Sequence, residues 1–336
     1  MPKRLRVELE SIASDPNLCQ AAYLAARGRR SRPQILEFYH RFQENIHRIG
    51  REILDESYRP KPTRQFVIHD PKRRIIDAPI FADRVVHHAL ILQIGGYLDQ
   101  ALIENTFACR QGLGPLRAVW RVQSYCRKYP WYVKLDIRSY FHSIDHDVLR
   151  CQLQRRFKGD RLHRLIGELI AGYQGDKRVG LPIGALTSQH FANYYLNVLD
   201  RMVIALDETL GYVRYMDDFL CWAENSEACK RIHRRVSNFL RDHLKLEVHP
   251  RRQIQRSYRG VTFGGYRVLP DRLLLSHRRK LRYMAHYRKY EADYASGRIG
   301  VDTLQRLYQS AYALTAHSDS LNWRKSVHRD NSHWMQ

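Results

Sequence analysis

The stretch RYMDDFL, residues 214–220, constrains the fold of this chain more than any other part of the sequence. It sets two adjacent aspartates, Asp217 and Asp218, inside a run that is otherwise mostly apolar and aromatic. Aspartate is depleted in strands and neighbouring like charges repel, so an ordinary half-buried strand does not favour this pattern. The flanking runs YVRYM and FLCWA instead predict two strands joined by a tight turn at the aspartates. At such a turn the alternation of side chains breaks, and both carboxylates can lean toward one bound cation.

A third carboxylate, Asp136, ends the predicted buried strand YVKLD. If this strand lies beside the predicted hairpin in one sheet, three acids converge. Their repulsion amounts to about 4 kcal/mol per pair at roughly 4 Å for an effective dielectric of about 20, which calls for a divalent metal. Hard oxygen ligands without nearby thiolates or a histidine trio select Mg²⁺, with Mn²⁺ as a substitute.

Two such ions can stabilise the attacking and leaving oxygens of an in-line displacement at phosphorus, so the three acids predict nucleotidyl transfer. An isolated Asp-Asp pair is also common in turns, and that interpretation stays open for the pair taken alone.

The charge balance indicates the partner. Lys and Arg total 57 against 34 Asp and Glu, a formal net charge of +23. A polyanion neutralises such an excess, so nucleic acid is the leading partner and a membrane surface the weaker alternative. No apolar run approaches spanning length, and the start MPKRLRVELESIAS lacks the apolar stretch of a signal peptide, so we expect a cytoplasmic protein without membrane association. The six cysteines form no C-x-x-C pair and do not indicate a zinc site.

The remaining hydrophobic pattern predicts an α+β chain. Helical spacing covers residues 1–58, and a hairpin with a basic tip follows around the turn signal at residues 70–71. The segment GLPIGALTSQHFANYYLNVLDRMVIAL predicts a loop that opens one long helix, and an amphipathic helix is expected from Ser226 to about His243. Short strands are expected in LKLEVHPRR and GVTFGGYRVLP, and the very basic segment from Ser276 onward is predicted to be helical.

Several of these segments resemble the sequence boxes of reverse transcriptases. RYMDDFL is similar to their Y-x-D-D box, YVKLDIRSYFHSID to their first catalytic motif, and GLPIGALTSQHFANYYLNVLD to the motif between them. GVTFGGYRV resembles the primer-grip hairpin, and HDPKRRIIDAPIFADRVVHHAL resembles the basic fingers motif, with TFACRQGLGP after it. The boxes stand in family order over about residues 58 to 270.

The resemblance implies a right-hand polymerase fold of the α+β class, in which helices pack on an antiparallel palm sheet. The expected parts are an N-terminal helical segment (1–57), fingers (58–130), a palm with interleaved fingers helices (131–270) and a short, basic helical thumb (271–336).

The resemblance also implies the catalytic residues. Asp136 and Asp217 would hold two Mg²⁺ ions, and the backbone carbonyl of Ile137 would be a further ligand. Asp218, the third catalytic acid and also part of the expected metal site, would lie slightly behind them and shape the site electrostatically.

Nucleotide contacts follow from the same resemblance. Lys72 and Arg74, near the tip of the fingers hairpin, would meet the triphosphate of the incoming nucleotide. Phe141 would lie beneath the sugar and fill the space of a ribose 2′-OH, which favours deoxynucleotides. A core aromatic is the alternative for Phe141.

The segment from Ile183 to Gln189, IGALTSQ, resembles the I/V/L-G-x-x-x-S-Q mark of reverse transcriptases from diversity-generating retroelements. Ile183, Gly184 and Gln189 would then contact the nucleotide. An apolar Ile183 replaces the usual glutamine, which removes a penalty for mispositioned pairs and predicts low fidelity. Gly184 would let the backbone approach the nucleotide closely.

The implied function is RNA-directed DNA synthesis, error-prone at adenines, that diversifies a target gene by mutagenic retrohoming. The implied partners are a template RNA, the RNA/DNA hybrid, deoxynucleoside triphosphates and a small basic oligomeric accessory protein. A retron or antiphage-defence reverse transcriptase is the alternative within the same chemistry. A non-catalytic RNA-binding scaffold is the alternative outside it, and the clustered acids argue against it because unpaired charges are costly to keep without a metal.

Overall fold

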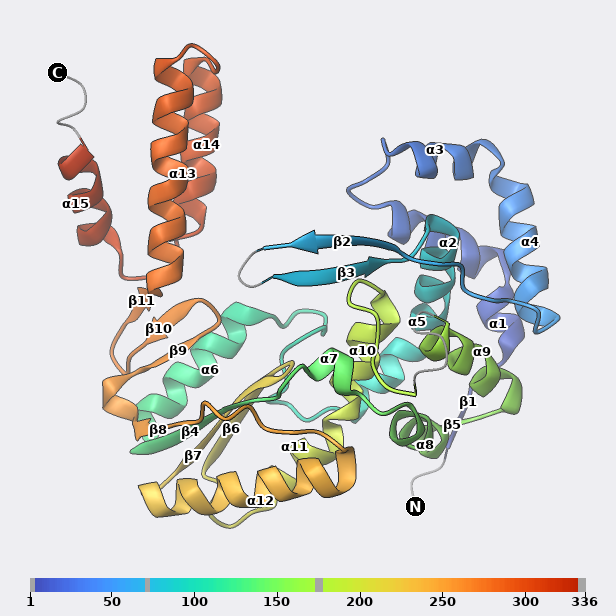
Figure 1. The fold of residues 1–336 in the computed structure, drawn as a ribbon, viewed down its shortest axis with the longest axis horizontal. Coiled ribbons are helices and arrows are strands. Elements are labelled where there is room, and N and C mark those ends of the chain that lie inside the picture. The colour runs from blue at the N-terminus through green and yellow to red at the C-terminus, as the bar shows by residue number, and fades with distance from the viewer. Residues whose placement is uncertain (1–3, 70–72, 173–177, 332–336) are drawn as a thin grey trace.

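The computed structural model describes residues 4–69, 73–172 and 178–331. Its centre is a four-stranded antiparallel sheet with the strand order β6-β7-β4-β8 (Figure 1). The strands are β4 (Trp131–Asp136), β6 (Gly211–Tyr215), β7 (Asp218–Ala223) and β8 (Gln253–Arg256). The strand predicted to end at Asp136 and the two strands predicted around the aspartate pair are therefore confirmed, and they are neighbours in one sheet.

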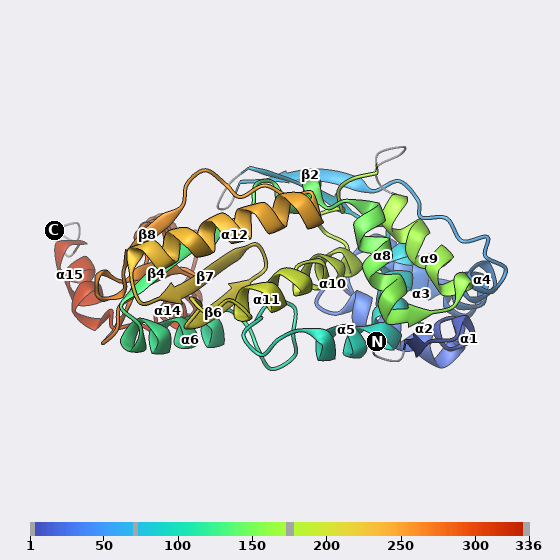
Figure 2. The same cartoon turned by 90° about the horizontal axis from the view of Figure 1, so that it is seen from below.

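Alternating side chains of β4 face different helices. Val133 and Leu135 belong to the main core cluster together with apolar residues of α12 (Ser226–Leu244), which crosses one face of the sheet (Figure 2). Tyr132 packs instead with apolar residues of α6 (Pro115–Lys128) on the other face. Because side chains alternate along a strand, Asp136 points to the same face as Tyr132. The acidic residues therefore lie on the α6 face, at the end of the sheet.

A second, three-stranded sheet follows the central one. Its antiparallel strands are β9 (Val261–Phe263), β10 (Tyr266–Val268) and β11 (Leu273–Leu275). Their apolar side chains share a core cluster with α6, so this small sheet is anchored to the same face as the acids.

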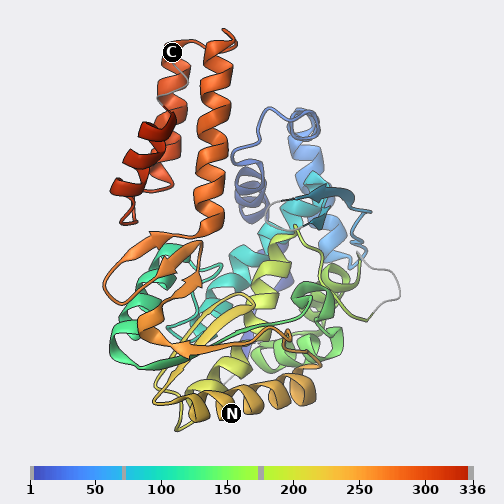
Figure 3. The ribbon, with the colours of Figure 1, turned by 60° about the vertical axis from the view of Figure 1, so that its left-hand side comes forward.

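The C-terminal helices stand apart from both sheets (Figure 3). They are α13 (His277–Ala295), α14 (Val301–Ala313) and α15 (Leu321–Asn331), which confirms the predicted helical C-terminal region. A small apolar cluster of Tyr283, Ala311 and Val327 takes one residue from each helix, and Trp323 of α15 also packs against the core cluster of the small sheet.

The N-terminal region is helical, as predicted. Its helices are α1 (Leu9–Ala13), α2 (Asp15–Ala26), α3 (Pro33–His40) and α4 (Phe42–Leu54). They gather around the long helix α5 (Phe81–Ala101), against which α2 packs with four buried alanines. Small side chains let these two helices approach closely, and the Asn17 amide donates to the carbonyl of Ala89 at 3.1 Å.

The predicted basic hairpin is formed by β2 (Arg64–Ile68) and β3 (Arg74–Ala78), which pair in antiparallel register and extend away from α1–α4 (Figure 1). Its tip, with Lys72, lies outside the described residues.

Two predictions of secondary structure were wrong. The helix expected to run unbroken after the IGALTSQ loop is divided into α10 (Leu186–Tyr195) and α11 (Asn197–Ile204), because Leu196 has ψ near −1° rather than a helical value. The strand expected in LKLEVHPRR does not form: Val248 makes only an isolated bridge to Ile137, and Pro250 lacks the N–H that a ladder needs.

Smaller elements and three further helices complete the part of the chain that the structure describes. They are β1 (Leu5–Arg6), α7 (Tyr140–Ser143), α8 (His146–Arg156), β5 (Phe157–Lys158), α9 (Asp160–Ala171) and a 3-10 turn (Ser257–Arg259). Within the described ranges, none of the helices combines the length and the apolar character that crossing a bilayer requires.

Candidate active site

The aspartate pair lies at the turn between β6 and β7. Tyr215 pairs with Asp218, so Met216 and Asp217 form a two-residue connection. Met216 has a φ of 57°, in the left-handed region that favours glycine. For a residue with a side chain this conformation costs about 1–2 kcal/mol, and it persists only where the surroundings hold it. The backbone that carries Asp217 is therefore held in place by contacts outside the turn.

Asp136 and Asp218 are directly opposite each other on β4 and β7. Directly opposite residues point to the same face of a sheet, and like charges in such a pair destabilise it. Burial raises the pKa of Asp217 and raises that of Asp218 to about 6, and in both cases the negative charge of Asp136 raises the pKa further. The three acids thus act on one another electrostatically.

Lys134 partly compensates this negative charge. Its ammonium nitrogen lies 3.0 Å from Oδ2 of Asp218 and donates to the carbonyl of Thr262 at 2.8 Å. The other oxygen of Asp218, Oδ1, is buried and has no hydrogen-bond partner among the described residues. A buried carboxylate oxygen without a hydrogen-bond donor is costly. Oδ1 of Asp218 is therefore available to bind a cation.

The donor chemistry fits a hard divalent ion. The site offers carboxylate oxygens of Asp136, Asp217 and Asp218, and the backbone carbonyl of Ile137 follows directly in the chain. In the ranges that the structure describes, no three His, Cys, Asp or Glu side chains are grouped as a ready metal site. Side chains alone therefore do not form a complete ligand set, and backbone carbonyl, water or substrate oxygens would have to complete it.

Arg74 is the residue of the basic hairpin that the structure brings toward these acids. It opens β3, its side chain is exposed, and its positive charge lowers the pKa of Asp217 against the effect of burial. Arg74 at the start of β3 therefore lies within electrostatic range of the acidic turn.

The loop before α10 is attached to the same hairpin. The backbone N–H of Asp77 donates to the carbonyl of Ile183 at 2.8 Å. Gly184 has a φ of 137°, and a Cβ there would lie 2.7 Å from the carbonyl oxygen of Asp77. The packing of β3 therefore requires this glycine, which is a different reason from the predicted approach to a nucleotide.

Two other residues predicted to contact the nucleotide, Phe141 and Gln189, differ in how exposed their side chains are. Phe141 is half-buried, makes an edge contact with Tyr140 at a centroid distance of 5.7 Å, and packs against the main core. Gln189 is exposed on α10, and its Oε1 accepts a weak hydrogen bond from the Cys109 thiol at 3.6 Å. The core contacts of Phe141 agree with the alternative interpretation as well as with the functional one.

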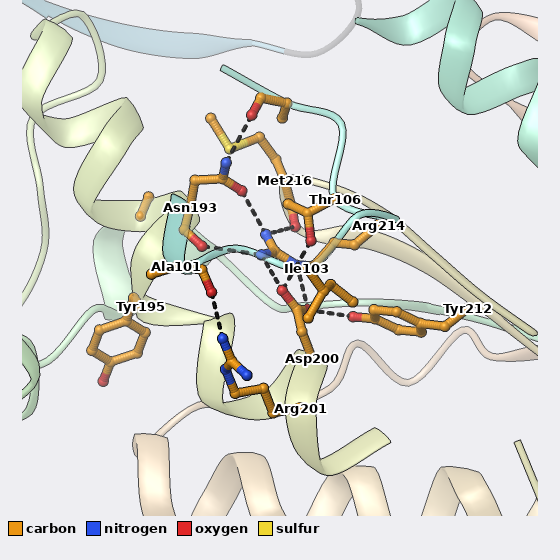
Figure 4. A network of polar contacts seen from close by, with 12 residues as sticks. Ala101, Ile103, Thr106, Asn193, Tyr195, Asp200, Arg201, Tyr212, Arg214 and Met216 are labelled. Atoms are coloured by element: carbon orange, nitrogen blue, oxygen red, sulfur yellow. Dashed lines mark hydrogen bonds and ion pairs between the residues drawn. The ribbon is translucent and has the colours of Figure 1, made fainter. Parts of the chain in front are cut away.

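Two features of the site were missed from the sequence. One is Lys134, a cation within the buried strand YVKLD, and the other is the buried pair of Arg214 and Asp200 behind the turn (Figure 4). In each case a charged residue inside an apolar run was the available signal, since such a residue needs a partner when it is buried.

Comparison with known proteins identifies the family. Residues 60–268 match the family described as reverse transcriptase (RNA-dependent DNA polymerase). The chain is 22% identical over 298 residues to the group II intron-encoded protein LtrA of Lactococcus lactis subsp. cremoris, covering 67% of this chain and 50% of LtrA. It is also 22% identical over 267 residues to protein YkfC of Escherichia coli (strain K12), covering 66% of this chain and 70% of YkfC. The chain thus spans about half the length of LtrA.

Solved structures of telomerases are also similar. Telomerase from Candida albicans in complex with a fragment of telomeric RNA has a TM-score of 0.49 at 11% identity, covering 72% of this chain and 50% of that one. Apo telomerase from Candida tropicalis, truncated from the C-terminal domain, has a TM-score of 0.48 at 14% identity, covering 64% and 55%. The family match, which extends over more than half of the residues and includes the whole acidic site, carries the assignment. With its predicted α+β right-hand polymerase fold, this chain belongs to the reverse transcriptase (RNA-dependent DNA polymerase) family.

Proposed function

We propose that this protein synthesises DNA on an RNA template by nucleotidyl transfer, with Asp136, Asp217 and Asp218 as its catalytic acids. The observation that carries the proposal is the position of Asp136 opposite Asp218, beside the turn that holds Asp217. Membership of the reverse transcriptase family supports it. Acids placed this closely repel one another unless a cation neutralises them. Phosphoryl transfer uses such cations, which explains why the protein has three acids at this position.

Asp136 and Asp217 would hold two Mg²⁺ ions, for which Mn²⁺ could substitute, and the carbonyl of Ile137 would add a ligand. When bound, such ions stabilise the attacking and leaving oxygens at phosphorus. Asp218 would act behind the other two acids, with its Oδ2 held by Lys134. Asp218 would contribute to the negative electrostatic potential of the site, because Lys134 neutralises its carboxylate only in part.

Arg74 and Lys72 would neutralise the triphosphate of the incoming nucleotide. The effect of Arg74 on the pKa of Asp217 supports this role, because it requires the guanidinium to lie near the acids. Phe141 would select deoxynucleotides by occupying the space of a 2′-OH.

We further propose that the enzyme belongs to the type found in diversity-generating retroelements and copies adenines with errors. The loop IGALTSQ supports this, with Ile183, Gly184 and Gln189 beside the nucleotide. A small basic oligomeric protein would be its partner, along with a structured template RNA. Retron or antiphage-defence reverse transcription is the first alternative. The similarity to LtrA favours an intron-associated reverse transcriptase as a further candidate.

The same proposal divides the chain into an N-terminal helical segment (1–57), fingers (58–130), palm (131–270) and thumb (271–336). The course of the chain supports it: the central sheet lies within the proposed palm, and α13–α15 lie within the proposed thumb.

Primer extension on an RNA template tests the activity. With deoxynucleotides and Mg²⁺ the parent should extend the primer, and Asp217→Asn should slow extension about a thousand-fold. Asp147→Asn is the matched control, since this carboxylate at the start of α8 is 56% exposed and pairs only distantly with Arg178, at 3.8 Å. An Asp217→Asn variant that extends as fast as the parent would overturn the catalytic proposal and leave the RNA-binding scaffold as the function.

Sequencing of the extended products tests the subtype. The parent should misincorporate more often opposite template adenines than opposite the other three bases. Ile183→Gln should reduce this error about ten-fold, because a polar group then goes unpaired with a mispositioned nucleotide. Equal error rates opposite all four bases in the parent would reject the diversity-generating assignment while leaving the polymerase assignment intact.

A further inference from the structure

The guanidinium of Arg214 lies at the centre of a closed polar network behind the acidic turn (Figure 4). Its side chain is completely buried, and its Nε and Nη2 atoms donate to the two carboxylate oxygens of Asp200 at 2.7 and 2.6 Å. Nη1 donates to the side-chain oxygen of Asn193 at 2.8 Å, and Nη2 donates to the backbone oxygen of Asn193 at 3.0 Å.

The remaining contact of Arg214 reaches the turn itself. Nη1 donates to the carbonyl oxygen of Met216 at 3.1 Å. That carbonyl belongs to the peptide bond that joins Met216 to Asp217. Arg214 thus makes five hydrogen bonds, as many as a guanidinium has N–H groups. Because the group is planar and all its donors are engaged, it cannot rotate without breaking several of these bonds.

Asp200 is held as tightly as Arg214. The hydroxyl of Tyr212 donates to Oδ1 at 2.7 Å and the hydroxyl of Thr106 donates to Oδ2 at 3.1 Å. The network therefore joins α10, α11, β6 and the segment after α5. Thr106 comes from a distant part of the chain and the other members from successive elements, so the position of the turn depends on how these elements pack.

Stability alone does not explain this ion pair. Replacing a buried ion pair by apolar residues of similar volume is often neutral or stabilising, since the charges lose their hydration on burial. What apolar residues cannot do is hold a backbone carbonyl in a left-handed turn. Among the described residues, the bond of this network that leads to the acids is the one from Arg214 to the Met216 carbonyl.

We propose that Arg214 is a positioning residue, which fixes the Met216–Asp217 peptide so that the Asp217 carboxylate is directed to the point beside Asp136 and Asp218. Asp200 and Asn193 hold the guanidinium in place for this purpose. The inference rests on the proposed catalytic role of Asp217 and deepens it. Arg214 itself is sealed from solvent, so it would act through the turn rather than by contact with substrate.

The test compares Arg214→Lys with Tyr195→Phe in single-turnover primer extension. Lysine keeps the positive charge near Asp200, but its compact ammonium cannot span Asp200, Asn193 and the Met216 carbonyl together. Tyr195→Phe removes a different buried hydrogen bond on α10, from the hydroxyl to the carbonyl of Leu244 at 2.7 Å, and leaves Arg214 untouched. Thermal unfolding measures how much each change loosens the fold.

We expect Arg214→Lys to lower the maximal rate of nucleotide incorporation about a hundred-fold, because small displacements of a catalytic group have effects of this size. The half-saturating nucleotide concentration should change less than about three-fold, and the half-saturating Mg²⁺ concentration should rise. Tyr195→Phe should keep the parental rate within about three-fold at a comparable loss of melting temperature. A rate for Arg214→Lys within three-fold of the parent, or an equal loss of rate in Tyr195→Phe, would overturn the inference.

Asn193→Ala tests the positioning role of Arg214 if Arg214→Lys fails to fold. It removes one acceptor of Nη1 and should lower the maximal rate about ten-fold, whereas an unchanged rate would overturn the inference. The Asp217→Asn variant separates the two proposals. If Asp217→Asn is inactive while Arg214→Lys or Asn193→Ala has the parental rate, only the positioning role fails; if Asp217→Asn is active, the proposed function fails.

Discussion

The ammonium group of Lys134 lies 3.0 Å from Oδ2 of Asp218 and simultaneously donates to the carbonyl of Thr262 at 2.8 Å. The same nitrogen lies 5.6 Å from the centre of the Phe263 ring, within the range of a cation–π contact. Lys134 therefore connects the acidic end of the central sheet with β9 of the small sheet. Its side chain is only 23% exposed, so these contacts are weakly screened by solvent.

Replacing Lys134 by Met should lower the free energy of unfolding by about 1–2 kcal/mol, because Asp218 then faces Asp136 and Asp217 without a cation. Urea unfolding without divalent metal measures the change. Arg138→Met is the control: its ion pair with Glu247 spans 3.4 Å between side chains that are 65% and 72% exposed, and its loss should have an effect below about 0.5 kcal/mol. Equal effects of the two substitutions would show that Lys134 is an ordinary surface cation.

Substitution of Gly184 by Ala should destabilise the protein by about 2–4 kcal/mol. The new Cβ would meet the Asp77 carbonyl at 2.7 Å, and the φ of 137° disfavours any side chain. Gly112→Ala separates the two causes, since Gly112 has a φ of 72° but no atom within 4 Å of an added Cβ. It should cost about 1 kcal/mol in the same denaturation experiment. If both variants lose the same stability, the close contact between position 184 and the Asp77 carbonyl does not contribute to the free energy of unfolding.

Asp217→Asn, which should slow primer extension about a thousand-fold, should also make the metal-free protein more stable by about 1 kcal/mol. Burial and the charge of Asp136 both raise the pKa of Asp217, so its ionised form is unfavourable in the folded state. Thermal unfolding in the presence of a chelator measures this gain, which should shrink when Mg²⁺ is added.

Asp145→Asn should change the free energy of unfolding in the opposite direction. Asp145 caps α8 by accepting from the N–H of Val148 at 2.9 Å and also accepts from Lys245 at 2.7 Å. These hydrogen bonds lower the pKa of Asp145 despite its burial, so loss of its charge should reduce stability. A loss of stability in both variants would show that the acids of the site do not repel one another significantly.

The buried His87 should make the protein sensitive to mild acid. Its Nδ1 lies 2.8 Å from the hydroxyl oxygen of Thr187, and burial lowers its pKa from 6.5 to about 3. Between pH 6.5 and 3 the unfolded chain binds a proton at this residue that the folded chain does not, so stability is lost as the pH falls through this range. At pH 5 the loss from this one group is about 2 kcal/mol.

Unfolding free energies of the parent and of His87→Gln at pH 7.5 and pH 5 test this expectation. The parent should lose about 2 kcal/mol more than the variant between the two pH values. His47→Gln is the matched control, because it makes the same change of residue at a side chain that is 59% exposed beside Asp15. The same loss in the parent and in His87→Gln would contradict the assignment.

The sequence by itself determined the local elements of the site. Alternation of apolar residues and turn chemistry predicted β4, the β6–β7 hairpin and the basic hairpin, since these patterns depend on neighbours within a few residues. The order of the motifs also led to the reverse transcriptase family, to which residues 60–268 belong. The carboxylates of Asp136, Asp217 and Asp218 were selected for the same reason, as acids at the ends of apolar strands.

The tertiary structure decided which residues meet. The register that sets Asp136 against Asp218 and the contact of Lys134 with Thr262 join distant segments. The enclosure of Arg214 by Asp200 and Asn193 joins a strand to the two helices that precede it. Sequence patterns show that a charge lies in an apolar run but not which partner neutralises it, because burial and pairing are properties of the packed chain. For the same physical reason the sequence showed a glycine at position 184, and only the packed β3 strand showed that its own backbone leaves no room for a Cβ there.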